Sequence, residues 1–165
     1  EMKSTGEVMG TGDTFAGAFA RAQLGAGDDP PTSGLCLISV RDVDKPAAID
    51  VARRLVAQGF TLAATGGTAK ALENAGLAVQ QVNKVAEGRP HIVDLIKNDE
   101  AAMIINTTEG RRAIIDSASI RASAEQHRVF YTTTLAAAEA VCMALEQETD
   151  ITVRRLQDLH ESIAI

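Results

Sequence analysis

The stretch LAATGGTAKALENAG, which spans residues 62–76, decides the fold class of this chain of 165 residues. Its first residues continue an apolar run that begins at Phe60, which indicates a buried strand. From Thr68 the pattern changes to helical spacing, and Gly76 ends it. A strand that leads through a Thr-Gly-Gly-Thr turn directly into a helix is typical of a parallel sheet covered by helices.

The same alternation of strand and helix patterns continues along most of the chain. Short apolar runs predict strands at 35–40, 60–65, 77–83, 101–106 and 128–132. Helical spacing predicts helices at 46–58, 68–75, 91–98, 113–127 and 134–148, with a small strand and helix from 151 on. This order favours a Rossmann-like, three-layer α/β/α sandwich with a five-stranded parallel sheet.

A glycine- and proline-rich stretch, GAGDDPPTSG at 25–34, precedes the alternating region. Before it, residues 13–24 repeat apolar side chains at helical spacing. We therefore expect a boundary near residue 30, with 1–30 as a separate segment and linker, and 31–165 as the main domain. The opening residues Glu-Met-Lys-Ser indicate a piece cut from a longer protein.

Composition excludes several functions. The formal net charge is −6 and only 3% of the residues are aromatic, so we expect no nucleic-acid partner, which would need basic surface and stacking rings. No apolar run reaches the length of about 20 residues that a membrane span needs, and we expect no membrane partner. Cys36 and Cys142 each lie in an apolar stretch, which predicts buried free thiols and a cytoplasmic location.

Polar side chains follow every predicted strand, at the edge where open parallel sheets bind ligands. They are Ser39, Arg41 and Lys45 after the first; Thr65, Gly66, Gly67 and Thr68 after the second; Asn83, Lys84, Glu87 and Arg89 after the third; Asn106, Thr107, Thr108, Gly110, Arg111 and Arg112 after the fourth; and Thr132, Thr133 and Thr134 after the fifth. Glycine amides, a helix N-terminus, hydroxyls and ammonium groups suit a phosphate monoester. The sequence therefore predicts that the Thr-Gly-Gly-Thr turn holds a phosphate.

Each motif also has an interpretation without a ligand. Thr-Gly-Gly-Thr is an ordinary turn and helix cap, because Thr often caps helices and Gly often occupies turns. Asn106, Thr107 and Thr108 are equally compatible with a strand end followed by a helix cap. Taken singly, Lys45 and Lys84 are compatible with solvated surface groups. The phosphate prediction therefore depends on the fold that brings these residues together.

No known catalytic centre is recognisable in the residues. His91 is best interpreted as a helix-start residue, and His127 and His160 have no partner in the pattern. Asp94 and Asp116 are single carboxylates in helical segments. Without a Ser-His-Asp, Cys-His or paired-carboxylate set, the residues predict a small-anion site with no catalytic base and no metal.

Three stretches carry a family resemblance: EMKSTGEVMG at 1–10, VNKVAEGRPHIVDLIKN at 82–98 and IINTTEGRRAIIDS at 104–117. In their order and spacing they resemble the C-terminal end of the carbamoyl-phosphate synthetase large subunit. The resemblance covers essentially the whole chain. It implies a regulatory domain with the methylglyoxal-synthase-like fold, preceded in residues 1–30 by the tail of an ATP-grasp synthetase half.

The resemblance also implies the ligands of this domain. It assigns a site for the nucleotide effectors UMP, an inhibitor, and IMP, an activator, to Ser39, Lys45, Thr65, Gly66, Thr68, Lys84, Asn106, Thr107, Thr108 and Asp116. It assigns Tyr131 and Thr133 to the activator ornithine, whose carboxylate partners would come from the synthetase half. The domain would control carbamoyl phosphate synthesis for pyrimidine and arginine biosynthesis.

The catalytic parts of such an enzyme would lie outside this chain. The resemblance implies an ATP-dependent, glutamine-hydrolysing ligase that uses ATP, magnesium or manganese, and potassium. Its partners would be the synthetase halves of the same chain and a glutaminase small subunit, in a hetero-oligomer. For this stretch alone we expect no catalytic residues and no cofactor.

Two other hypotheses stay open. Methylglyoxal synthase and inosinate cyclohydrolase share the fold, and the second begins with a motif that resembles TGGTAKAL, so an enzyme is one alternative. Production of methylglyoxal by the purified chain would distinguish it. The other alternative is an interaction module with a vestigial pocket, in which Lys84→Ala or Thr68→Ala would leave UMP affinity unchanged.

Overall fold

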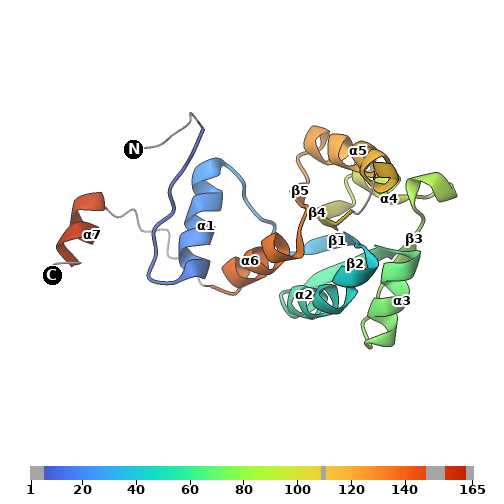
Figure 1. Ribbon diagram of the computed structural model, residues 1–165, viewed down its shortest axis with the longest axis horizontal. Coiled ribbons are helices and arrows are strands. Elements are labelled where there is room, and N and C mark those ends of the chain that lie inside the picture. Colours follow the sequence, from blue (N-terminus) through green and yellow to red (C-terminus); the bar gives the residue numbers. More distant parts are fainter. Residues whose placement is uncertain (1–5, 109–110, 148–154, 163–165) are drawn as a thin grey trace.

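The computed structural model describes residues 6–108, 111–147 and 155–162, and for residues 111–116, 156 and 162 it describes the backbone alone. Within this part of the chain, five strands form one sheet in the order β3-β2-β1-β4-β5 (Figure 1). They are β1 (Gly34–Ser39), β2 (Phe60–Thr65), β3 (Gln80–Val82), β4 (Ala101–Asn106) and β5 (Phe130–Thr132). Every neighbouring pair is parallel.

Helices follow the strands as the periodicity predicted. The described helices are α1 (Phe15–Ala26), α2 (Lys45–Ala57), α3 (Gly66–Asn74), α4 (Ile92–Lys97), α5 (Arg111–Gln126), α6 (Leu135–Leu145) and α7 (Leu156–Ser162). Two short 3-10 helices, η1 (Asp42–Asp44) and η2 (Val85–Glu87), lie in the loops after β1 and β3. The small strand predicted from 151 falls on residues outside the described ones.

Two apolar cores, one on each face of the sheet, hold the three layers together. In β1, Cys36 and Ile38 join a core with α2, α3 and α6, whereas Leu37 between them joins a core with α4 and α5. Figure 1 shows α2 and α3 on one side of the sheet and α4 and α5 on the other. Burial of both faces explains why the strands are continuous apolar runs, and the predicted α/β/α sandwich is confirmed.

Several element boundaries differ from the sequence pattern, and at the starts of β3 and β5 the preceding helix end takes up residues with strand-like side chains. Leu77 does not enter β3, since its amide donates to the Leu72 carbonyl at 3.1 Å and closes α3. Val129 does not enter β5, since its amide donates to the Ala124 carbonyl at 2.8 Å and closes α5. At the other end of α3, extended Thr65 is the N-cap, so the helix begins two residues before the predicted start at 68.

The N-terminal helix is joined to the rest of the described structure. The Thr14 hydroxyl accepts a hydrogen bond from the Gly17 amide at 3.1 Å and caps α1. The helix packs against α6, and Phe19 is partly buried against the core shared with α2 and α3. Gly10 lies so close to α1 that a side chain there would collide with the Ala18 carbonyl. The boundary near residue 30 stays a prediction.

Both thiols are expected to be unreactive in the folded protein. Cys36 and Cys142 are free and buried in the same core. Burial raises the pKa of Cys36 and raises the pKa of Cys142 to about 11, so the nucleophilic thiolate is scarce at neutral pH. Ellman's reagent should therefore label neither thiol in the native protein and both after unfolding in guanidinium. Rapid labelling of one thiol in the native state would contradict this assignment.

Candidate functional site

The sheet changes direction of winding at β1, and a cavity lies beside this point. The chain adds β2 and β3 on one side of β1 and then crosses to add β4 and β5 on the other. Connections therefore leave the carboxyl ends of β1 and β4 in opposite directions, which opens a crevice between them. A cavity of about 400 Å³ is lined there by residues that follow β1, β2, β3 and β4.

The cavity brings together most of the residues predicted for the nucleotide site. Its lining includes Ser39, Lys45, Thr65, Thr68, Lys84, Asn106, Thr107 and Thr108. Gly66, the first residue of α3, is not part of the described lining. A Cβ atom added there would lie 3.8 Å from the side-chain amide nitrogen of Gln81 on β3. Asp116 lies in α5, and its side chain is outside the described part of the structure. The sheet thus brings predicted residues from four strand ends into one cavity, although the first and last of them, Ser39 and Thr108, are 69 positions apart in the sequence.

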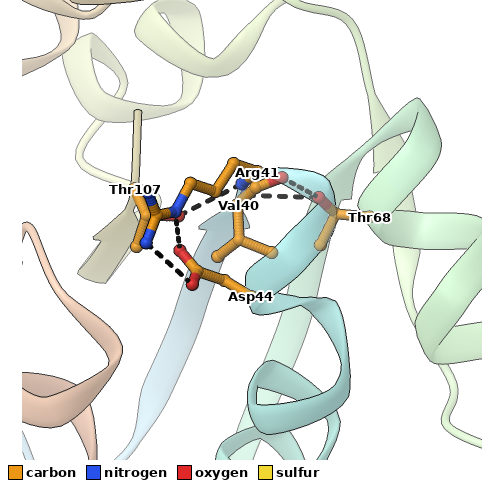
Figure 2. A network of polar contacts seen from close by, with 5 residues as sticks. All are labelled: Val40, Arg41, Asp44, Thr68 and Thr107. Atoms are coloured by element: carbon orange, nitrogen blue, oxygen red, sulfur yellow. Dashed lines mark hydrogen bonds and ion pairs between the residues drawn. The ribbon is translucent and has the colours of Figure 1, made fainter. Parts of the chain in front are cut away.

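Two hydroxyls of the Thr-Gly-Gly-Thr turn attach α3 to the end of β1. The Thr68 hydroxyl accepts a hydrogen bond from the Val40 amide at 3.2 Å and donates to the Val40 carbonyl at 3.3 Å (Figure 2). The Thr65 hydroxyl lies 3.0 Å from the Ser39 hydroxyl. Thr65 and Thr68 are each only 3% exposed. The turn is therefore built into the sheet edge, and the Thr68 side chain has hydrogen-bond partners within the protein.

A second set of hydrogen bonds attaches the end of β4 to the loop after β1. The Arg41 amide donates to the Thr107 hydroxyl at 3.1 Å (Figure 2). The Thr107 amide donates to the Ser39 carbonyl at 3.1 Å. The Arg41 guanidinium contacts Asp44 at 2.7 Å. The hydrogen bond from this guanidinium is the main cause that lowers the pKa of Asp44, and a hydrogen bond from the Thr107 hydroxyl lowers it further. The wall formed by β1 and β4 is thus held in place before any ligand arrives.

Two ammonium groups and a helix N-terminus give the cavity its positive charge. The Lys45 side chain, at the first residue of α2, is 25% exposed. Its Nζ lies 3.2 Å from the position that a Cβ atom on Gly67 would take, which places the ammonium over the first turn of α3. Lys84 also lines the cavity, and its backbone amide donates to the Glu87 carboxylate at 2.9 Å. Ammonium groups near the positive end of a helix dipole suit a bound phosphate.

Sequence reasoning missed part of the lining. Asp42 brings a carboxylate to the site, and Val85, Ile92 and Ile120 supply an apolar wall. Glu87, which the sequence placed after the third strand without a role, adds a second carboxylate. Asp42 could have been suspected from its position three residues before Lys45. Ile120 comes from the middle of α5, and its contribution follows from helix packing, which local sequence does not specify. An apolar wall beside a polar one suits the base and the phosphate of a nucleotide.

A second cavity, of about 620 Å³, contains the residues predicted to contact ornithine. Tyr131 and Thr133 line it together with the carboxylate residues Asp28, Asp29 and Glu125. Thr132, also in the lining, is 5% exposed, and its hydroxyl oxygen has no hydrogen-bond partner. In the sequence, Thr132 was only one of three consecutive threonines after the fifth predicted strand, and no ligand was assigned to it.

One hydrogen bond connects the two cavities. Asn106, which lines the first, donates from its amide to the Tyr131 hydroxyl of the second at 3.0 Å. Asn106 is 3% exposed, and burial is the main cause that raises the pKa of Tyr131. The contact places residues from neighbouring strands β4 and β5 between the two sites.

The described residues form no group of three or more His, Cys, Asp or Glu side chains that could hold a metal ion. Among the same residues, no helix combines the length and apolar character needed to cross a bilayer.

Comparison with known proteins identifies the class of protein that this fold defines. Residues 47–133 match the family described as the MGS-like domain, and the chain belongs to that family. Among solved structures, it is similar to methylglyoxal synthase from Elizabethkingia anophelis NUHP1, with a TM-score of 0.55 over 72% of this chain and 80% of that chain. The identity of 18% limits this likeness to the fold, and the predicted methylglyoxal-synthase-like fold is confirmed.

Relatives found by sequence identify the protein more narrowly than the shared fold does. Over 99% of its length the chain is 62% identical to the carbamoyl phosphate synthase large chain of Pseudomonas putida. It is also 62% identical to the protein of that name from Halomonas eurihalina and 53% identical to that of Xylella fastidiosa. The chain spans 15% of the length of the Pseudomonas putida relative. The predicted resemblance to this large chain is therefore confirmed.

Proposed function

We propose that this chain is the allosteric domain of a carbamoyl phosphate synthase large chain and that its first cavity binds the nucleotide effectors UMP and IMP. The observation that carries the proposal is the convergence of Lys45, Lys84 and the α3 N-terminus at the carboxyl ends of four strands. The phosphate would lie between the two ammonium groups. The nucleoside would extend toward the apolar wall that includes Ile92 and Ile120.

The effect of such a ligand would be a coupling free energy between this cavity and a distant catalytic site, typically about 1–3 kcal/mol. The ligand acts only if it binds one arrangement of the domain better than another. The distant site would belong to the synthetase halves of the same chain, together with ATP, magnesium or manganese, and potassium. A glutaminase small subunit would complete the hetero-oligomer, in the cytoplasm, and the product would serve pyrimidine and arginine biosynthesis.

Ornithine is the proposed ligand of the second cavity. The side chains of Tyr131 and Thr133 offer hydroxyls, and Asp28, Asp29 and Glu125 offer carboxylates that suit the two ammonium groups of the amino acid. The unpartnered Thr132 hydroxyl adds a further hydrogen-bonding group that a polar ligand would satisfy. The carboxylates predicted from the synthetase half would supplement this set.

The carboxylates that line the first cavity are engaged in contacts that disfavour an enzyme of the same fold. Asp42 forms an ion pair with Lys45 at 2.6 Å, and Glu87 accepts a hydrogen bond from the Lys84 amide. A general base works best when its pKa lies near the operating pH, whereas the hydrogen bond from Lys45 lowers the pKa of Asp42. The arrangement of the described residues is therefore better suited to binding an anion than to removing a proton from a substrate.

Calorimetric titration tests the proposal. We expect UMP to bind at one site per chain and uridine to bind at least about tenfold more weakly, because charge-assisted hydrogen bonds to the phosphate are the strong ones. Incubation of the same protein with dihydroxyacetone phosphate should yield no methylglyoxal. Absence of heat and of thermal stabilisation at millimolar UMP would contradict the proposal, and so would production of methylglyoxal.

A further inference from the structure

A carboxylate of the protein contacts one of the two ammonium groups that line the first cavity. Asp42 Oδ1 lies 2.6 Å from Lys45 Nζ, and both residues line the cavity. Lys45 is largely enclosed, with 25% of its side chain exposed, whereas the Asp42 side chain is 91% exposed. The exposed carboxylate thus contacts the partly enclosed ammonium from the solvent side.

Both ammonium groups of the cavity act on this carboxylate. The hydrogen bond from Lys45 is the main cause that lowers the pKa of Asp42, and the charge of Lys84 lowers it further. The field that would hold a phosphate therefore already acts on Asp42. Its partner Lys45 also lies over Gly67, at the first turn of α3.

We propose that Asp42 is an internal competitor for the anion, which holds Lys45 when the cavity is empty and must leave it when a phosphate binds. The inference rests on the proposed function, because it assumes that the cavity accepts a phosphate group. Asp42 can leave without disturbing the core: it lies at the start of the exposed 3-10 helix η1, in which no residue is buried. Asp42 would thus set the affinity for the effector while making no favourable contact with it.

The competing idea is that Asp42 only positions Lys45 for the ligand. The two ideas predict opposite signs when the carboxylate is neutralised. If Asp42 competes, Asp42→Asn frees the ammonium and strengthens binding of the anion. If Asp42 positions Lys45, the same substitution weakens binding.

The chain offers a matched control in Asp50 on α2. Asp50 is 77% exposed and forms an ion pair with Arg53 at 3.2 Å, at the same i,i+3 spacing as Asp42 and Lys45. It does not belong to the described lining of the cavity. Asp50→Asn and Asp42→Asn change the net charge equally, so the control separates a local effect from the general effect of one charge fewer.

The test is calorimetric titration of the wild type and both variants with UMP, uridine and inorganic phosphate, at low and at high salt. For Asp42→Asn we expect UMP and phosphate to bind about two- to fivefold more tightly, a small gain because exposed ion pairs are weak. The gain should shrink at high salt, because salt screens exposed charges. Uridine binding and the Asp50→Asn variant should show no change.

Unchanged or weaker binding of phosphate and UMP by Asp42→Asn would overturn the inference. Inorganic phosphate distinguishes this result from failure of the proposed function. If the wild type bound phosphate but showed no preference for UMP, the nucleotide proposal would fail, while the ratio of phosphate affinities between Asp42→Asn and wild type would still decide the role of Asp42. If the wild type bound neither ligand, both ideas would be overturned.

Discussion

Replacement of both Lys45 and Lys84 by Gln is expected to weaken UMP binding by about 100-fold, because a hydrogen bond to a charged group contributes about 1.5–3 kcal/mol. The two ammonium groups come from α2 and from the loop after β3, and they line the same cavity. Neither side chain is buried in the core, so the temperature of unfolding should stay close to that of the wild type. Calorimetry of the double variant with UMP and uridine measures the effect.

Lys70 provides the control for this experiment. It is exposed on α3, the helix whose N-terminus faces the cavity, but it is not part of the described lining. Lys70→Gln should leave UMP affinity within about twofold of the wild type, because salt screens an exposed charge that does not contact the ligand. Wild-type UMP affinity in the double variant would favour the vestigial-pocket hypothesis. An equal loss for uridine and UMP would show that the lysines do not act on the phosphate.

The fold could be predicted because the sequence pattern and the tertiary structure agree in most elements. Runs such as LCLISV and AAMIIN are apolar at the buried positions of the sheet, except for Asn106 at the end of β4. The strands β1 and β4 that they form lie next to each other in the sheet. The strand order could not be predicted in this way. It depends on where the connection after β3 crosses the sheet, and the residues of that connection do not specify which side of β1 it reaches.

The sequence predicted which side chains line the site, but it did not predict their hydrogen-bond partners within the protein. The sequence suggested that Thr68 and Thr107 face a ligand, and both do line the cavity. Their hydroxyls, however, are bonded to the backbone of Val40 and Arg41 in the loop after β1. Such contacts join residues 28 and 66 positions apart, and only the three-dimensional arrangement reveals them.

The contact between Thr68 and Val40 changes how one of the obvious mutations must be interpreted. Thr68→Ala would be a natural test of a ligand role, but in the structure the hydroxyl serves the backbone amide and carbonyl of Val40. A loss of UMP affinity in that variant could follow from a displaced α3 rather than from a lost ligand contact. Stability without ligand is therefore the more informative measurement.

Thr68→Val is expected to lower the free energy of unfolding by about 1–3 kcal/mol in the absence of any ligand. Valine has a similar shape, but it leaves the buried Val40 amide and carbonyl without this partner, and an unsatisfied buried polar group carries a cost of that size. Urea denaturation of the ligand-free protein measures the change as a shift of the midpoint at constant slope. Thr68→Ser, which keeps the hydroxyl, should lose only the contribution of one methyl group, about 1 kcal/mol or less.

Thr61→Val is the control, because Thr61 is exposed on β2 and its hydroxyl makes only a long contact of 3.5 Å with the Gly34 carbonyl. That substitution should change stability by less than about 0.5 kcal/mol. If Thr68→Val left the midpoint unchanged and still abolished UMP binding, the hydroxyl would belong to the ligand and not to the junction of β1 with α3. If Thr68→Val lowered stability and Thr68→Ser restored both stability and UMP affinity, the turn would act by holding α3 in position, with its backbone amides left to bind the phosphate.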